Sequence, residues 1–156
     1  MKQMLYHWSS PIGWLQIKAD NKALQAIHFL EQKPGKDNPQ PNDIIRRTIT
    51  QLEDYFIGSL KEFSLHLDPQ GTDFQQTVWQ QLCNIPYGQT SSYGQVAEML
   101  GDAKKVRAVG RANGQNPISI VIPCHRVIGA NGDLIGYGGG IKRKRRLLQH
   151  EGALLL

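Results

Sequence analysis

Cysteine, histidine and arginine follow one another in residues 122–127, which read IPCHRV. A cysteine of ordinary pKa is only a few per cent thiolate near neutral pH, so a nucleophilic cysteine usually has a base or a positive charge beside it. His125 and Arg126 are residue types that supply these two aids. Most unpaired cysteines are small buried hydrophobes, but these neighbours favour an activated nucleophile at Cys124.

The second cysteine, Cys83, offers an internal comparison. It ends residues 74–83, an amphipathic helical pattern without a nearby basic residue, and this predicts a packing role. With two cysteines, no signal-like apolar start and no stretch long enough to span a bilayer, the sequence predicts a reducing compartment, cytoplasmic or nuclear, and no membrane association. A disulfide between Cys83 and Cys124 is disfavoured there. Neither Cys-x-x-Cys nor His-x-x-x-His occurs, so no metal site is predicted.

Two further motifs accompany the cysteine segment: residues 116–117 (NP), upstream of Cys124, and residues 150–152 (HEG) near the end of the sequence. The three together resemble the 6-O-alkylguanine-DNA alkyltransferases, which are methylated-DNA–protein-cysteine S-methyltransferases. The resemblance covers about residues 74–152. A joint match of separated motifs is far more specific than a lone Pro-Cys pair.

The resemblance implies direct DNA repair. The Cys124 thiolate would take the alkyl group from 6-O-alkylguanine, and from 4-O-methylthymine, in double-stranded DNA after the nucleotide has flipped out. His125 would accept the thiol proton through a water, and Glu151 would orient the imidazole. A thioether does not hydrolyse, so each chain would repair one lesion, as a single-turnover methyltransferase. The resemblance also implies a monomer without a cofactor.

Further roles come from the same resemblance. Asn116 would hydrogen-bond across the turn that precedes the cysteine segment, and Tyr93 would support the flipped nucleotide and help to protonate the departing guanine. Core packing is the alternative role for Tyr93. Gly138 stands where many relatives carry a serine, so a hydrogen bond to the alkylated oxygen would have to come from the backbone. The implied substrate pocket is lined by Val127, Tyr137, Gly138 and Lys144.

Positive charge is confined to one half of the sequence. Residues 1–71 hold eight Lys/Arg and eight Asp/Glu, whereas residues 72–156 hold ten and five, which leaves a net charge of 10 − 5 = +5. A basic surface attracts phosphate backbones and gives a salt-dependent affinity. A solvated basic face is the alternative, both for the half as a whole and for the run at residues 142–146.

Two short helices are predicted around residue 101. Residues 92–95 (SYGQ) have capping-box spacing, Gly101 suits a left-handed cap, and a second helix runs from about Ala103 to Ala112. Such a pair is typical of a helix-turn-helix, although an ordinary helical hairpin has the same pattern. In the resembled family this unit enters the minor groove, and Arg107 matches the arginine that fills the gap left by the flipped nucleotide. The implied DNA contacts are Ser92, Lys104, Arg107, Ala108, Gly110 and Arg111.

The amino-terminal half reads as a small antiparallel sheet followed by a helix. Residues 5–9, 14–19 and 24–30 alternate as strands between turn-forming segments, and residues 33–42 form a loop. A helix capped by Asn42 or Asp43 runs to Gly58, and residues 63–67 form one more half-buried strand.

The predicted fold class is therefore α/β, of the α+β type. Residues 1–71 form a sheet-and-helix domain, RNase H-like by resemblance. Residues 72–156 form a mostly helical DNA-binding and alkyl-acceptor domain with the helix-turn-helix. The same pattern fits two competing functions. A module that recognises alkylated bases without transferring anything would lack the cysteine, and a cysteine hydrolase would turn over; the presence of Cys124 and the basic helix pair argue against both.

Overall fold

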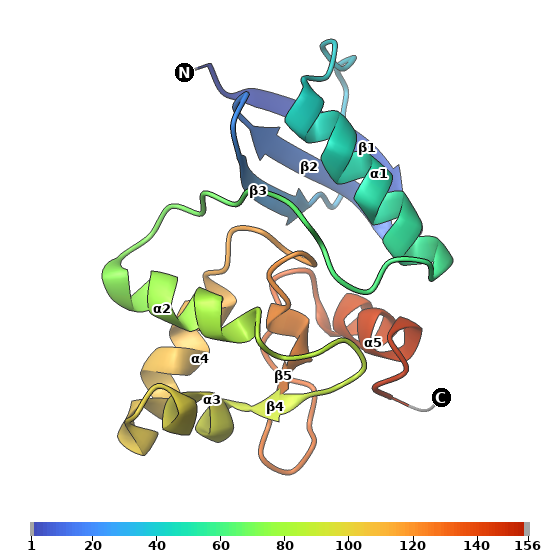
Figure 1. Cartoon of the computed structure of the whole chain (residues 1–156). Coiled ribbons are helices and arrows are strands. Elements are labelled where there is room, and N and C mark those ends of the chain that lie inside the picture. The colour runs from blue at the N-terminus through green and yellow to red at the C-terminus, as the bar shows by residue number, and fades with distance from the viewer. Residues whose placement is uncertain (1, 155–156) are drawn as a thin grey trace. The chain divides into compact units, whose positions relative to one another are not determined.

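A three-stranded antiparallel sheet begins the chain in the computed structural model, which describes residues 2–154 (Figure 1). Its strands are β1 (Met4–Ser10), β2 (Gly13–Ala19) and β3 (Leu24–Phe29), in the order β1-β2-β3. Gly13 has φ 123° at the β1–β2 turn, a conformation that glycine adopts without strain. The three predicted strands are confirmed, with ends that differ by one residue or so.

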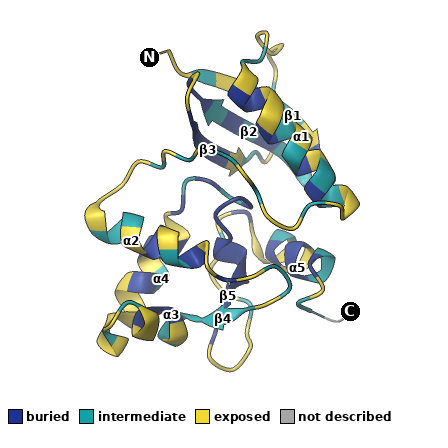
Figure 2. Ribbon diagram, viewed as in Figure 1, coloured by how far each residue is buried: buried dark blue, intermediate teal, exposed yellow. Residues whose placement is uncertain are grey.

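Helix α1 (Asp43–Ile57) covers one face of this sheet (Figures 1 and 2). Of the two predicted caps, Asn42 is the one used, because its side chain accepts a hydrogen bond from the Ile45 N–H. Gly58 ends the helix with φ 91°. The buried stripe of α1 faces fully buried strand residues, and together they form the core: Ile45, Thr48, Leu52, Tyr55, Leu15, Ile17 and Ile27.

The predicted strand at residues 63–67 does not form. Only Leu67 makes a parallel bridge to Leu24, where the Leu24 N–H donates to the His66 carbonyl and the Asp68 N–H donates to the Leu24 carbonyl. Alternation of apolar residues was not enough, since a strand also needs a partner along its length. The chain folds into two compact units: residues up to Gln70 form one together with Pro117–Ser119, and Gly71–Asn116 form the other with the residues from Ile120 on.

The second unit contains the remaining helices. They are α2 (Asp73–Leu82), α3 (Tyr93–Met99), α4 (Val106–Gly114) and α5 (Ile141–His150). Thr72 and Ser92 each form a complete capping box, with Gln75 and Gln95 respectively. Two-residue strands β4 (Ser91–Ser92) and β5 (Val127–Ile128) pair in parallel. The α+β fold class is confirmed.

The second helix of the predicted pair is split in two. A 3-10 turn occupies Ala103–Lys105, begun by Asp102, whose side chain accepts from the Lys104 N–H, and α4 follows directly. Gly101 has φ 91°, as expected for a left-handed residue after α3. A hydrogen bond joins α2 to α4: Trp79 Nε1 on α2 donates to the Ala112 carbonyl on α4 at 2.8 Å.

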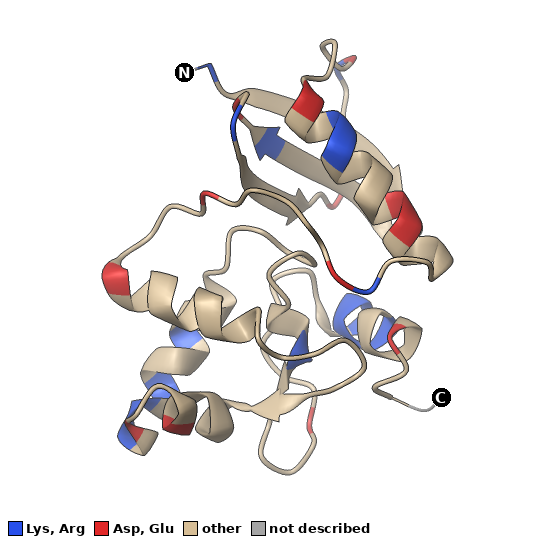
Figure 3. Ribbon diagram, in the orientation of Figure 1, with Lys and Arg blue, Asp and Glu red and all other residues tan. Residues whose placement is uncertain are grey.

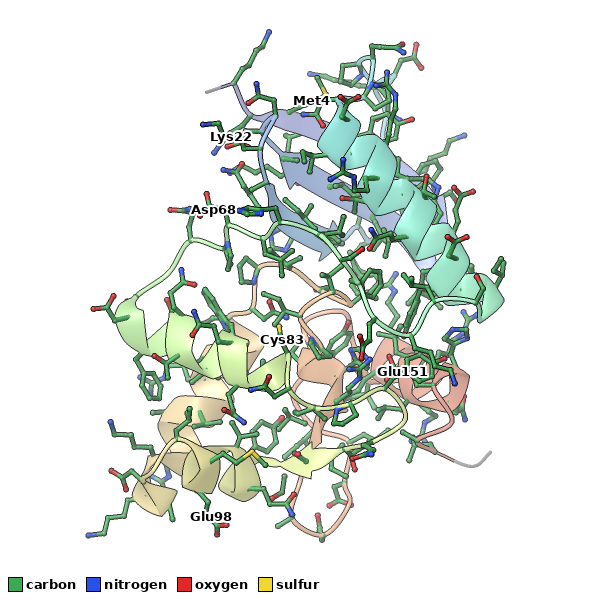
Figure 4. All side chains as sticks on the ribbon, in the orientation of Figure 1. Met4, Lys22, Asp68, Cys83, Glu98 and Glu151 are labelled. Carbon is green, nitrogen blue, oxygen red and sulfur yellow. The ribbon has the colours of Figure 1, made fainter. Side chains whose placement is uncertain are left out.

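Cys83 is exposed rather than packed, which corrects the prediction for it. It is the C-cap residue, one position beyond the end of α2 at Leu82, and is labelled in Figure 4. Both cysteines are free thiols. Within residues 2–154, no helix combines the length and the apolar character that a bilayer span requires.

Candidate active site

Cys124 lies in a 3-10 turn, Cys124–Arg126. The turn closes with a hydrogen bond from the Arg126 N–H to the Pro123 carbonyl. Upstream, Ile120 has φ 72°, an outlier for a β-branched residue that typically stores about 1–3 kcal/mol of strain. The turn brings three buried polar side chains, from Cys124, His125 and Arg126, into one small region of the second unit.

A buried carboxylate joins the two basic residues of the turn. Glu151 follows α5 and accepts three hydrogen bonds: from His125 Nε2 to Oε2 at 2.8 Å, from Arg126 Nε to Oε1 at 2.7 Å and from Arg126 Nη2 to Oε2 at 3.1 Å. The side chains of His125 and Glu151 are fully buried. Burial alone would raise the pKa of Glu151, but the hydrogen bonds and charges of His125 and Arg126 outweigh it and lower that pKa to about 2. Glu151 is therefore a carboxylate at any physiological pH.

The imidazole of His125 is held in one orientation. Because Nε2 faces a permanently ionised carboxylate, it carries the hydrogen, and Nδ1 is left as the acceptor in the neutral ring. Nδ1 is buried and has no hydrogen-bond partner among the described residues. Burial lowers the pKa of His125, the hydrogen bond and charge of Glu151 oppose this, and the charges of Arg126 and Lys144 lower it further. A neutral imidazole with a free acceptor nitrogen is the form that a general base needs.

The Cys124 thiol is not a preformed thiolate. The residue is 5% exposed, and burial raises the pKa of its thiol to about 11 against the opposing effects of a hydrogen bond from Asn116 and the charge of Lys144. The cation that acts on the sulfur is thus Lys144, and not Arg126 as the sequence order suggests. Arg126 is committed elsewhere, because its guanidinium bonds to Glu151 and, through Nη1, to the Ile85 carbonyl at 2.6 Å. A proton acceptor is therefore required for nucleophilic attack.

Asn116 and Lys144 hold the backbone around the cysteine. Asn116 Nδ2 donates to the Ile122 carbonyl at 2.8 Å, across the turn between α4 and the cysteine segment. Lys144 is fully buried on α5, and its ammonium donates to the Val127 carbonyl at 2.6 Å and to the Ile135 carbonyl at 2.7 Å. Burial lowers the pKa of Lys144 to about 8, and the negative charge of a Cys124 thiolate would raise it. Lys144 therefore links the cysteine segment to the loop that contains Ile135.

That loop also contacts helix α3. The Tyr93 hydroxyl, at the start of α3, donates to the Ile135 carbonyl at 3.0 Å. A Cβ on the next residue, Gly136, would lie 3.3 Å from the same hydroxyl, and its φ of 63° is one that favours glycine. Burial and the charge of Cys124 both raise the pKa of Tyr93, so the phenol keeps its proton. Further along the loop, Tyr137 is half-buried, and Gly138 is exposed with open space where a side chain would be.

The residues expected to contact DNA fall into two groups. Lys104, Arg107, Ala108 and Arg111 are exposed on the turn and helix α4, where the ribbon in Figure 3 has several Lys and Arg positions. Gly110 is half-buried instead, and a Cβ there would lie 3.7 Å from the Tyr93 ring, so its small size serves the packing of α4 on α3. The Ser92 hydroxyl accepts from the Gln95 N–H at 3.0 Å as the helix cap.

Replacing Lys144 with Met tests the link between helix α5 and the cysteine. The change removes the cation that lowers the thiol pKa and leaves two carbonyls without their donor, for a loss of about 1–3 kcal/mol in unfolding free energy. We expect Cys124 alkylation by iodoacetamide, recorded as a rate profile between pH 6 and pH 8 where Lys144 is still largely protonated, to be slower in the variant at each pH than in the parent protein, with Cys83 replaced by Ser in both. Lys142→Met, on an exposed position of the same helix, is the control and should leave the profile unchanged. An unchanged profile in Lys144→Met would remove the electrostatic role of the lysine.

Sequence reasoning did not identify what Arg126 binds. It treated the arginine as a charge beside the thiol, whereas the structure uses it to hold Glu151 and the Ile85 carbonyl. One signal for this was present: an arginine inside an apolar run must be paired when it is buried. No signal in the sequence indicated that the partner is Glu151, which is 25 residues away.

Comparison with known proteins gives consistent matches over more than nine tenths of the chain. Residues 73–153 match the family described as 6-O-methylguanine DNA methyltransferase, DNA binding domain, and residues 1–69 match its ribonuclease-like domain. A methylated-DNA–protein-cysteine methyltransferase of Mycobacterium tuberculosis is 50% identical over 145 residues, which is 91% of this chain and 88% of that protein. One from Methanosarcina acetivorans is 45% identical over 150 residues, or 94% and 96% of the two chains. The crystal structure of Mycobacterium tuberculosis OGT in complex with DNA superposes with a TM-score of 0.85 at 48% identity, covering 94% of this chain and 91% of that one.

Proposed function

Because the chain belongs to the 6-O-methylguanine DNA methyltransferase family, we propose that it repairs double-stranded DNA by moving the alkyl group of 6-O-alkylguanine onto Cys124. The observation that carries this proposal is the buried cluster in one unit, in which Asn116 and Lys144 act on the Cys124 thiol and Glu151 holds His125. The same chemistry extends to 4-O-methylthymine, whose alkylated oxygen is equivalent.

In the proposed reaction the thiol proton passes through a water to Nδ1 of His125. The sulfur–carbon bond forms as the bond between the alkyl carbon and the guanine oxygen breaks. The guanine leaves with a proton, so in sum the alkyl group replaces the thiol hydrogen and the base gains one. Asn116 and Lys144 favour the thiolate as it develops, since both lower the pKa of the thiol.

Tyr93 is the proposed donor of the proton to the departing guanine. Its hydroxyl keeps its hydrogen because its pKa is raised, and it lies at the loop that forms the proposed pocket wall. To reach the base, the hydroxyl has to leave the Ile135 carbonyl, its acceptor in this structure. The backbone of Val127 and the segment with Tyr137 and Gly138 complete the proposed pocket.

The alkylated base has to leave the helix stack before the sulfur can reach it. Extrusion costs a few kcal/mol, less for a weakened pair, and this favours damaged bases. We assign the filling of the vacated space to Arg107, an exposed residue on the second helix of the pair. The other proposed DNA contacts are Ser92, Lys104, Ala108 and Arg111. Stacking of a guanidinium in the gap would offset part of the extrusion cost.

Arg107→Ala should separate extrusion from chemistry. We expect transfer from DNA to fall at least about tenfold, in line with a stacking contribution of about 1–3 kcal/mol, while transfer from free 6-O-benzylguanine stays near the parent rate. Single-turnover rates with the two substrates measure this. Arg47→Ala, an exposed arginine of α1, controls for the loss of one positive charge. Equal losses on DNA and on free base would remove the extrusion role.

Stoichiometry distinguishes this function from the two alternatives. Isotope-labelled methyl groups in DNA should appear on the protein up to a ceiling of one per chain, because the thioether is not hydrolysed. Sustained turnover would identify a cysteine hydrolase, and tight binding without transfer would identify a recognition module. We also propose that residues 1–71 and 72–156 act as separate domains in a monomer that works in the cytoplasm, which two free cysteines support.

A further inference from the structure

One carboxylate serves two positive or potentially positive partners in the buried cluster. Glu151 Oε2 accepts from both His125 Nε2 and Arg126 Nη2, at 2.8 and 3.1 Å, while Oε1 accepts from Arg126 Nε at 2.7 Å. The guanidinium thus grips the carboxylate in a fork, and the imidazole shares one of its oxygens. A histidine paired with a carboxylate alone would feel that negative charge undiminished.

An uncompensated carboxylate would be a problem for a base. A negative charge at hydrogen-bond distance favours the protonated imidazole, and an imidazolium has no lone pair with which to take a thiol proton. Burial is the largest effect that favours the neutral ring, and the positive charge of Arg126 adds to it by opposing the field of Glu151 at the ring. The other charged groups that face His125 act in the same direction or arise later: Lys144 is a second cation, and Cys124 carries charge only once it has ionised.

We propose that Arg126 is a positioning residue that keeps His125 neutral, by neutralising the carboxylate that orients it, so that the base stays available at and below neutral pH. The expected effect on the transfer rate rests on the proposed function. The neutral state of His125 rests on the buried contacts alone. Arg126 would then be a fourth part of the site, beside the nucleophile, the base and the carboxylate. It is a cation that does not contact the substrate.

The arginine itself is held by contacts that serve no part of the reaction. Its Nη1 donates to the Ile85 carbonyl at 2.6 Å, and its guanidinium carbon lies 5.8 Å from the centre of the Tyr87 ring. Burial and the charge of Glu151 raise the pKa of Tyr87, so this ring is a neutral neighbour. With one face supported by the ring and one nitrogen fixed on a carbonyl, the fork has a single orientation towards Glu151.

Histidine side-chain NMR tests the proposal without any substrate. In the parent protein we expect the His125 ring to be the neutral tautomer with its hydrogen on Nε2 from pH 8 down to pH 6 or below. Long-range nitrogen–proton spectra identify the tautomer, and a His125→Gln protein assigns the signal among the five histidines. An imidazolium at pH 7 in the parent protein would overturn the proposal, whether or not any variant folds.

Three variants separate charge from shape. In Arg126→Gln we expect the pH at which His125 protonates to rise by about one unit or more, as for a group facing an unscreened opposite charge. Arg126→Lys keeps a cation and should stay near the parent value. The double variant Arg126→Gln, Glu151→Gln removes both charges, so His125 should again stay neutral across the range. Thermal melting confirms that each variant is folded before its spectrum is recorded.

The single-turnover rate of methyl transfer should follow the same order. Its acid limb should move up by about one pH unit in Arg126→Gln, so that the loss approaches about tenfold at pH values well below the parent limb. The limb should return to its parent position in the double variant when rates are normalised to their plateau. A plateau that falls equally in Arg126→Gln and Arg126→Lys, with no shift of the limb, would show a purely structural role and overturn the proposal. If the NMR titrations shift as expected but no variant or parent transfers methyl, the proposed function fails while the charge compensation stands.

Discussion

After incubation with DNA that contains 6-O-methylguanine, we expect the intact mass of the protein to increase by one methyl group, located on Cys124 by peptide mapping. Cys124→Ala should show no gain at all, because the side chain that accepts the carbon is gone. Affinity for the same DNA should stay within about twofold, since the proposed phosphate contacts lie on α4 and the turn before it and are independent of the sulfur. Gel-shift titration at fixed salt measures that affinity.

Cys83→Ala is the matched control for this experiment. Cys83 is the other free thiol and is the more exposed of the two, so simple accessibility would favour it as the methyl acceptor. Unchanged transfer in Cys83→Ala, together with complete loss in Cys124→Ala, would show that the environment of Cys124 decides the reaction. If Cys124→Ala lost transfer and DNA affinity together, the residue would have to be reassigned as a packing residue.

Glu151→Gln should be the most destabilising single change in the cluster. It leaves the buried guanidinium of Arg126 without its counter-ion, which typically costs about 3–5 kcal/mol of unfolding free energy. Transfer should also fall, by at least about a hundredfold, as His125 loses the acceptor that sets its tautomer. Urea unfolding at pH 7 and single-turnover transfer measure the two effects.

The same variant should change how stability depends on acid. The pKa of Glu151 is lowered in the folded chain from its ordinary value of 4.5 to about 2. A depressed carboxyl pKa stabilises the fold above the unfolded value, and that stabilisation is lost as the pH falls from about 4.5 towards 2. Unfolding free energy should therefore fall less steeply between pH 5 and pH 3 in Glu151→Gln than in the parent protein.

Glu98→Gln provides the control for both measurements. Glu98 is exposed on α3, and Figure 4 shows its side chain pointing away from the helix. Its stability should change by no more than about 0.5 kcal/mol, as is usual for surface sites. Equal effects of Glu98→Gln and Glu151→Gln would show that the loss reflects net charge and not the buried contacts of Glu151.

Local signals predicted most of the elements correctly. The capping box at Ser92 and a cap at Asn42 or Asp43 are predicted from residues within one helical turn, so almost no tertiary information is needed; the structure selects Asn42 of the two caps. The strand expected at residues 63–67 failed for the opposite reason, since pairing depends on a partner elsewhere in the chain. The same holds for Pro117–Ser119, which join the first unit through the bridge between Ile27 and Ile118.

The sequence by itself determined the residues able to react, because the chemistry of a thiol, an imidazole, an amide and a carboxylate follows from the residue type, and their motifs are spaced as in the family. It also determined the caps and apolar stripes that begin and end the helices. Only the tertiary structure decided which cation acts on which anion. Arg126 adjoins His125 in sequence yet pairs with Glu151, and Lys144, from α5, is the cation that acts on Cys124. The physical reason is that charge interactions depend on distance and burial in space, and burial of a charge is tolerated only where folding brings its partner to hydrogen-bond distance.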